Sequence, residues 1–93
     1  MCKHFKIKIT GKVQGVWFRK YTLLKALDYE LKGMVRNQAD GSVYVEVESN
    51  NEESLQAFIQ WLHKGSPQSN PEEIIILEES GECKGYKNFS IER

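Results

Sequence analysis

The apolar residues of this 93-residue chain change their spacing in a definite order, and that order restricts the folds open to it. From Phe5 to Ile9 they alternate with polar residues, which is typical of a strand with one buried face. From Phe18 to Leu31 there is no glycine or proline, and helix-forming residues dominate. The expected core stripe of this helix comprises Phe18, Thr22, Ala26 and Tyr29. The chain therefore begins with a strand followed by a helix.

A turn signal then joins two further strands. A short strand is expected over 34–38, and Asp40-Gly41 behind it strongly favours a hairpin. Valines alternate with polar residues over 43–47, which predicts the next strand. We expect the two strands to lie side by side and antiparallel.

The second helix is marked at both ends. Asn50, with Glu53 three residues later, is similar to a capping box, with asparagine in place of the usual serine or threonine. Gly65 is a typical helix stop. The apolar residues between them fall at the helical positions i, i+3, i+4 and i+7: Leu55, Phe58, Ile59 and Leu62.

Two strands complete the pattern. After a loop over 66–71 that contains both prolines, an apolar run over 74–77 predicts a strand that starts late, near Glu72 or Glu73. A glycine-containing turn and a short alternating strand over 89–91 follow.

The order β-α-β-β-α-β plus a short C-terminal strand predicts one domain over 1–93. Right-handed crossovers place both helices on one face of the sheet. The expected fold class is α+β, a ferredoxin-like two-layer sandwich with two helices on one face of an antiparallel sheet.

Composition excludes some classes of protein. Thirteen basic residues balance thirteen acidic ones, whereas a nucleic-acid-binding domain usually carries an excess of lysine and arginine. No apolar run approaches the roughly 18 residues of a membrane span, and the N-terminus does not resemble a secretory signal. Cys2 and Cys83 have no metal-ligand spacing, so we expect free thiols in a reducing cytosol and a cytoplasmic location.

The stretch from Gly11 to Arg19, G-K-V-Q-G-V-W-F-R, has the features of an anion cradle. Gly11 and Gly15 permit a tight turn that presents backbone N–H groups. The turn leads into a helix N-terminus, which favours an anion, and Arg19 lies in the first helical turn. A G-x-x-x-G turn before a helix is common, however, and the stretch is not a nucleotide-binding loop. Trp17 and Phe18 are expected to pack in the core or at its rim.

As a whole the stretch resembles the signature of the acylphosphatase family, G-x-V-Q-G-V-x-F-R, at every defined position. A second family signature, G-x-V-x-N-x-x-D-G-x-V, is matched by Gly33, Val35, Asn37, Asp40, Gly41 and Val43. The spacing between the two blocks fits, and the ending N-F-S-I-E-R is similar to the family's closing strand. The resemblance covers nearly the whole chain and implies the ferredoxin-like sandwich already expected.

The resemblance implies an enzyme that hydrolyses acyl phosphates with water to a carboxylate and inorganic phosphate. It implies that the loop amides and Arg19 hold the phosphoryl group and that Asn37 positions the attacking water. The expected phosphate-binding residues are Gly11, Lys12, Val13, Gln14, Gly15, Val16, Trp17, Phe18 and Arg19. No metal, cofactor or covalent nucleophile is implied, and neither a nucleic-acid nor a membrane partner is expected.

These residue types suit such a substrate, because a carboxylate leaves readily and needs no strong general acid. Phosphoryl transfer then depends on positioning and on charge stabilisation. Two alternatives remain. One is a non-catalytic module of the same fold that binds an anion or a partner. The other is an RNA-binding domain in which Tyr44 stacks on a base. Glu46 and Glu48 lie on the same strand face as Tyr44, and their negative charge argues against this alternative.

The chain departs from the family pattern at Glu30, where a glycine usually suits a left-handed helix end. Glu30 must adopt that conformation or let the helix end differently. Pro71 stands where an apolar residue is typical.

The cluster of Leu23, Leu24 and Leu27 is either core on a tilted helix or an exposed patch that pairs two molecules; a monomer is the simpler expectation.

Other polar residues carry no predicted chemistry. We expect His4 and His63 at the surface, the pair Glu52-Glu53 as charge at a helix N-terminus, and the pair Glu78-Glu79 as a solvated strand end.

Overall fold

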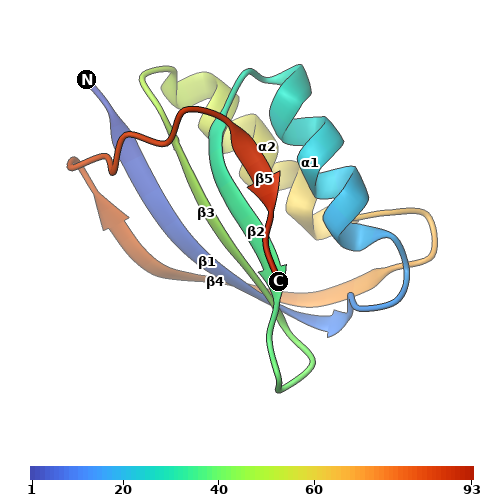
Figure 1. Ribbon diagram of the computed structural model, residues 1–93. Helices are drawn as coiled ribbons and strands as arrows, with labels where there is room; N and C mark the ends of the chain where they lie inside the picture. The colour runs from blue at the N-terminus through green and yellow to red at the C-terminus, as the bar shows by residue number, and fades with distance from the viewer.

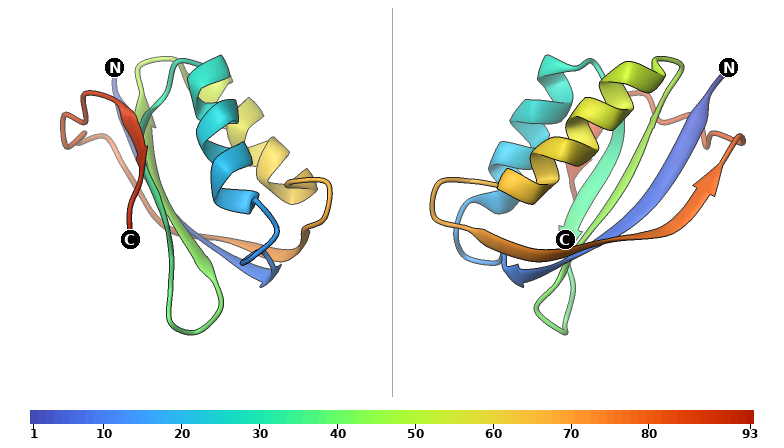
Figure 2. Two further views of the ribbon diagram at one scale, coloured as in Figure 1. Left: turned by 45° about the vertical axis from the view of Figure 1, so that its right-hand side comes forward. Right: turned by 180° about the vertical axis from the view of Figure 1, so that it is seen from behind.

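Five strands and two helices follow one another in the predicted order in the computed structural model, which describes residues 1–93. Both helices cover the same face of the sheet, and the edge-on views of Figure 2 separate the two layers clearly (Figures 1 and 2). The predicted two-layer sandwich is therefore confirmed. The elements are β1 (Lys3–Lys12), α1 (Phe18–Asp28), β2 (Lys32–Asn37), β3 (Val43–Ser49), α2 (Glu52–Lys64), β4 (Asn70–Ser80) and β5 (Phe89–Ile91).

The sheet has the strand order β4-β1-β3-β2-β5. The pairs of β1 with β3, β1 with β4 and β2 with β3 are antiparallel, but β5 lies parallel to β2. The prediction of an antiparallel sheet is thus wrong at one edge. β4 ends at the end of the sheet where β5 begins, and the segment 81–88 crosses from one edge to the other (Figure 1). A three-residue strand carries no sign of this direction in its sequence.

The core fills the space between helices and sheet, and the predicted stripes form it. Alternate residues of β1 and β3 are fully buried, as are the inner faces of both helices. Sixteen residues form the cluster, among them Phe5, Ile7, Ile9, Phe18, Ala26, Val43, Val45, Val47, Leu55, Phe58 and Leu62. Burial of this apolar surface is the main stabilising term of the fold. Neither helix is long and apolar enough to span a bilayer.

The helix ends differ from the prediction by a few residues. α1 stops at Asp28 rather than Leu31, and Glu30 adopts the left-handed conformation with φ of 57°. Glu30 thus takes the first of the two predicted alternatives. The N-cap of α2 is Asn51, not Asn50: its side chain accepts a hydrogen bond from the backbone N–H of Ser54 at 3.1 Å. Gly65 ends the helix as predicted.

β4 starts at Asn70, earlier than predicted, and contains Pro71. A proline is tolerated here because β4 is an edge strand and one side of its backbone has no partner strand. Ile75, Ile76 and Leu77 in its centre are exposed. Glu78 and Glu79 are exposed as predicted, and both form surface ion pairs with lysines of β1.

The leucine cluster of α1 divides between the two predicted alternatives. Leu23 packs against the core, whereas Leu24 and Leu27 are 45% and 53% exposed. Glu52 and Glu53 lie in the first turn of α2, as expected of charge at a helix N-terminus.

His4 is buried, with 1% of its surface exposed, so the prediction of a surface position is wrong. On the sheet face away from the helices its two ring nitrogens lie 2.7 Å from Glu48 Oε1 and 2.9 Å from Glu46 Oε1. Both ring nitrogens therefore have a carboxylate partner within hydrogen-bond distance, which satisfies the polar atoms of this buried ring. The chain after β4 covers this group, since the backbone N–H groups of residues 84–86 donate to Glu48. His63 is exposed, as predicted.

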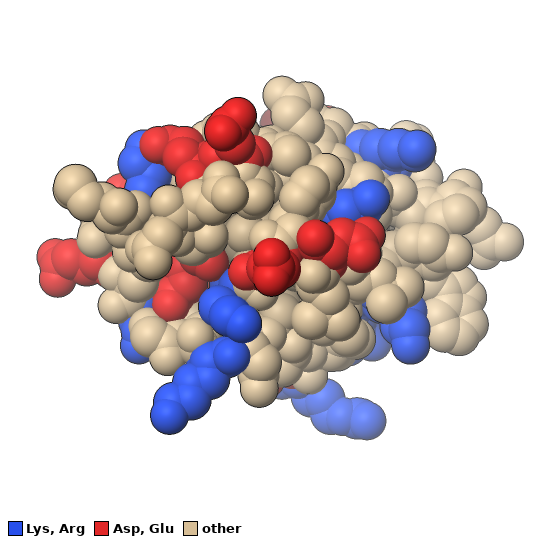
Figure 3. Space-filling view, turned by 90° about the horizontal axis from the view of Figure 1, so that it is seen from above, with Lys and Arg blue, Asp and Glu red and all other residues tan.

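Tyr44 belongs to the same buried group and is not available to stack on RNA. Its hydroxyl donates to Glu46 Oε2 at 2.8 Å, and burial followed by this bond raises the pKa of Tyr44. Burial by itself would raise the pKa of Glu46, but hydrogen bonds from Lys84 and Tyr44 outweigh it and lower that pKa to about 2. Acidic and basic side chains are also interspersed on the end of the molecule seen in Figure 3.

Cys2 and Cys83 form a disulfide, so the prediction of free thiols is wrong. The two residues are 81 positions apart in the chain, but their Cα atoms lie 6.1 Å apart. Sequence spacing gave no sign of this pairing, because only the crossing segment after β4 brings Cys83 beside the start of β1. The bridge ties this covering segment to the N-terminus.

Candidate active site

A cavity of about 460 Å³ brings the predicted catalytic residues together. Arg19 comes from the first turn of α1, and Asn37 is the last residue of β2. Eight residues line the cavity: Val13, Gly15, Trp17, Phe18, Arg19, Lys20, Asn37 and Ile91. Five of the nine predicted phosphate-binding residues are among them, and Gly11, Lys12, Gln14 and Val16 are not.

The loop before α1 is held by three buried side chains. Val13, Val16 and Phe18 are buried in the core, so the loop backbone is fixed where it turns. Gly15 makes the turn with φ of 73° and has open space where a Cβ would stand. The loop is thus anchored on one side and open on the other, as an anion cradle requires.

Gly11 has a different role from the one predicted, since it lies in β1 rather than in the turn. Its φ is positive, at 107°, but a Cβ at this position would collide with the backbone carbonyl oxygen of Asn70. The glycine therefore permits the close approach of β4 beside the loop. Lys12 is exposed at the end of β1.

Gln14 connects the loop to the β2–β3 hairpin. Its side-chain amide donates to the backbone carbonyls of Gln38 and Ser42, each at 2.8 Å. Gln38 directly follows Asn37, so these two bonds fix the hairpin end that carries the asparagine. On the other side of the loop, the buried hydroxyl of Ser66 donates to the carbonyl of Val16 at 2.7 Å.

The hairpin is also ordered from within. Asp40 accepts hydrogen bonds from the hydroxyl and the backbone N–H of Ser42, and Lys8 lies 2.9 Å from its carboxylate. These contacts hold the pKa of Asp40 well below its usual range, in this order of importance. These contacts therefore hold the predicted Asp40-Gly41 turn in one conformation.

The amide oxygen of Asn37 is buried and has no hydrogen-bond partner in the protein. Buried polar atoms without a partner are uncommon, and each one calls for an explanation. Because the residue lines the cavity, a rotation of its side chain would present this oxygen to a molecule bound there.

The electrostatic character of the cavity is positive. Arg19 and Lys20 line it, together with no aspartate or glutamate, and Arg19 forms no ion pair. The first turn of α1 contains no acidic residue, so nothing within it offsets the favourable field of the helix N-terminus. The arrangement suits a small anion.

Sequence reasoning missed two lining residues. Lys20 directly follows Arg19, and this adjacency was the available signal. Ile91 reaches the cavity because β5 pairs in parallel with β2. No sequence pattern reveals that pairing.

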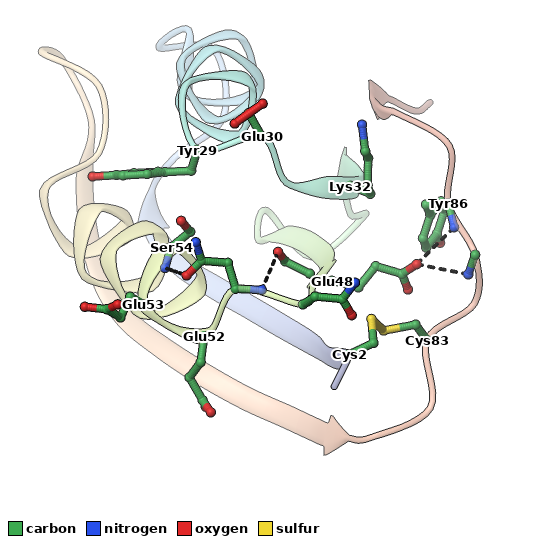
Figure 4. Close-up of a pocket in the computed structure, with 14 residues that line it drawn as sticks. Cys2, Tyr29, Glu30, Lys32, Glu48, Glu52, Glu53, Ser54, Cys83 and Tyr86 are labelled. Carbon is green, nitrogen blue, oxygen red and sulfur yellow. Dashed lines mark hydrogen bonds between the residues drawn. A yellow bond between two sulfur atoms is a disulfide. The ribbon is translucent and has the colours of Figure 1, made fainter.

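A larger cavity, of about 800 Å³, lies at the opposite ends of the same strands and helices (Figure 4). The Cys2–Cys83 bridge and Glu48 lie on one side of it, and Glu30 and the N-terminus of α2 on the others. Its polar groups bond to one another, as where the N–H groups of residues 85 and 86 donate to Glu48. None of the predicted site residues lines it, so we locate the site at the smaller cavity.

The fold and the site define a ferredoxin-like domain in which a glycine turn, an arginine and an asparagine surround one cavity. The family model for acylphosphatase matches residues 5–91. An acylphosphatase of Bacillus licheniformis is 39% identical over 87 residues, which cover 94% of each chain. One from Bacillus velezensis is 44% identical over 81 residues, 87% of this chain and 88% of that relative.

A solved structure gives the same result. The crystal structure of acylphosphatase from Bacillus subtilis matches with a TM-score of 0.91 and 34% identity, and each chain is covered completely. The chain belongs to the acylphosphatase family. The predicted family is thereby confirmed.

Proposed function

We propose that this protein is an acylphosphatase that hydrolyses the carboxyl–phosphate anhydride of acyl phosphates to a carboxylate and inorganic phosphate. The observation that carries the proposal is the meeting of Arg19 and Asn37 at one positive cavity, with the asparagine oxygen unpartnered. A module that only binds an anion needs donors, such as the arginine and the loop amides, whereas the unpartnered oxygen of Asn37 is an acceptor that suits a water molecule.

In the proposed reaction the phosphoryl group lies in the loop around Gly15. Its oxygens accept hydrogen bonds from loop N–H groups and from the planar fork of Arg19. Charge on these oxygens is what the protein must stabilise in phosphoryl transfer. The positive cavity without a carboxylate supports this role.

Asn37 would hold the attacking water by accepting one of its hydrogen bonds through Oδ1. An amide is too weak a base to take the proton, so a phosphoryl oxygen of the substrate takes it. The water oxygen forms a bond to phosphorus while the bond from phosphorus to the carboxylate oxygen breaks. The carboxylate leaves as a stable anion, so the step needs no general acid.

Hydrolysis of benzoyl phosphate, with a chelator present and no added metal, tests the function. Arg19→Ala and Asn37→Ala should each lower turnover by about 10²–10³-fold, the range found when one donor to a developing charge is removed. Tyr21→Ala, an exposed change outside the cavity on the same helix, is the matched control. Wild-type turnover in either site variant would remove that residue from the mechanism. Phosphate binding without any hydrolysis would leave only the binding module.

We further propose that the protein acts as a monomer, because one chain by itself brings Arg19, Asn37 and the loop around Gly15 to one cavity, so the mechanism needs no second copy. Light scattering across a concentration series tests this. If mass rises with concentration and Leu24→Lys abolishes the rise, then Leu24 and Leu27 form a contact between two copies.

We propose a cytoplasmic location, because charged acyl phosphates cross bilayers poorly and the enzyme must meet them where they form. Cell fractionation followed by immunodetection of the protein tests it. Recovery with the cytosolic fraction is expected, whereas recovery in an oxidising compartment, where bridges such as Cys2–Cys83 are common, would overturn the proposal.

A further inference from the structure

Trp17 is the most exposed aromatic side chain of the protein, with 70% of its surface accessible. Its two neighbours in the chain, Val16 and Phe18, are buried at 6% and 1% exposure. The indole packs against no other aromatic ring and is not part of the hydrophobic core. Core or rim packing, the role expected from the sequence, therefore does not explain a tryptophan here.

The backbone at Trp17 gives a second reason to seek a role for this side chain. Its φ and ψ are 65° and 15°, a left-handed conformation that a residue with a Cβ adopts only at a cost. Trp17 is the N-cap of α1, but its side chain makes no capping hydrogen bond. A glycine would satisfy the backbone better. Strained residues of this kind cluster at functional sites.

The residues that line the cavity beside Trp17 are of two chemical kinds. Arg19, Lys20 and Asn37 supply polar groups that suit the phosphoryl group. The four apolar lining residues are Val13, Trp17, Phe18 and Ile91. A phosphoryl group has the bulk of about three water molecules at ~30 Å³ each. Most of the 460 Å³ therefore remains for another group, and apolar side chains are available to contact it.

We propose that Trp17 determines the specificity of the site by holding the acyl group of the substrate against its indole ring, together with Val13 and Ile91. The inference rests on the proposed function. The substrate class that fits is an acyl phosphate with an aromatic or other bulky apolar acyl group, in preference to acetyl phosphate. A flat apolar wall favours a ring that can stack on it, and the absence of an acidic lining residue gives no partner to a cationic acyl group.

The test compares benzoyl phosphate with acetyl phosphate in the wild type and in Trp17→Gly, Trp17→Phe and Tyr21→Ala. Trp17→Gly removes the ring and also suits the left-handed backbone, so loss of folding is not expected. The ratio of kcat/KM for benzoyl over acetyl phosphate should fall about three- to tenfold in Trp17→Gly, the range of an aromatic stacking contact. Trp17→Phe should retain most of the ratio. Tyr21→Ala, one turn further along α1 and outside this cavity, should retain all of it.

A ratio unchanged by Trp17→Gly would overturn the proposal. If the wild type hydrolyses neither substrate, the proposed function fails. The role of Trp17 is then tested separately, by comparing the binding of benzoylphosphonate with that of acetylphosphonate. In a Trp61→Phe background Trp17 is the only tryptophan, and its fluorescence reports this binding directly. A preference for the benzoyl compound that Trp17→Gly abolishes supports the role, and equal binding of both compounds refutes it.

Discussion

Replacing Gln14 with leucine should separate phosphate binding from catalysis. The leucine keeps an apolar stem of similar length but removes both donors that hold the carbonyls of Gln38 and Ser42. Each such hydrogen bond contributes about 1 kcal/mol net, so the link between loop and hairpin weakens by about 2 kcal/mol. That difference corresponds to roughly 30-fold in an equilibrium or a rate. We expect kcat to fall by up to this factor.

The expected loss is specific to turnover because the two parts of the site are anchored separately. The loop with Gly15 keeps its buried valines and the bond from Ser66, so its affinity for phosphate should not change. The hairpin end with Asn37 loses its tie to the loop. Steady-state hydrolysis of benzoyl phosphate gives kcat and KM, and competitive inhibition by inorganic phosphate gives the affinity of the loop.

Gln38→Ala is the matched control. It removes a side chain that accepts from the Ser42 hydroxyl but keeps the backbone carbonyl that Gln14 contacts. It should therefore retain kcat. An unchanged kcat in folded Gln14→Leu would show that the position of Asn37 does not depend on these bonds. An equal loss of kcat and of phosphate affinity would instead assign Gln14 to phosphate binding and contradict the reasoning.

Three further outcomes follow from the structure. Reduction of the Cys2–Cys83 bridge should lower the free energy of unfolding by about 4.5 kcal/mol, because a crosslink of this span restricts the unfolded chain. Urea denaturation with and without a reductant measures the change, and Cys2→Ser/Cys83→Ser, which should not respond to the reductant, is the control. Acid should also destabilise the wild type, because the pKa of Glu46 is lowered from 4.5 to about 2 in the folded state. Its contribution is complete above pH 4.5 and is lost as the pH falls towards 2. Glu46→Gln should be less stable near neutral pH by about 1–3 kcal/mol and should lose less in this window; parallel stability curves would refute the assignment. Glu30→Gly should raise the free energy of unfolding by about 0.5–1 kcal/mol, since glycine adopts the left-handed helix end freely, and a loss of stability on denaturation would show that the Glu30 side chain matters more.

The sandwich was predictable because each of its main elements carries a local signature. Alternation of Phe5, Ile7 and Ile9 requires a two-sided strand, and Asp40-Gly41 requires a tight turn. These signals act over a few residues, so they can be read from the chain directly. Arg19 was found for the same reason, since it adjoins a glycine turn. Asn37 came from the family signature, and its unpartnered oxygen became visible only in the structure.

The remaining features depend on contacts between distant segments. His4 stands in an alternating strand on what would be a solvated face, and only the crossing segment 81–88 buries it. The same segment sets Cys83 beside Cys2 and turns Ile91 towards the cavity. The crossing segment 81–88 contains two glycines and no regular spacing of apolar residues, so its sequence does not indicate where it runs. One unpredictable connection therefore accounts for three of the errors.

The exposed edge strand β4 has a consequence for the solubility of the protein. Its outer edge has no partner strand, and with Ile75, Ile76 and Leu77 in its centre it is a template for addition of a second strand. The antiparallel self-pairing that sets Ile75 opposite Ile76 and Ile74 opposite Leu77 also sets Glu72 opposite Glu79 and Glu73 opposite Glu78. Like charges opposite each other are destabilising, so the strand opposes aggregation with its own copy by charge.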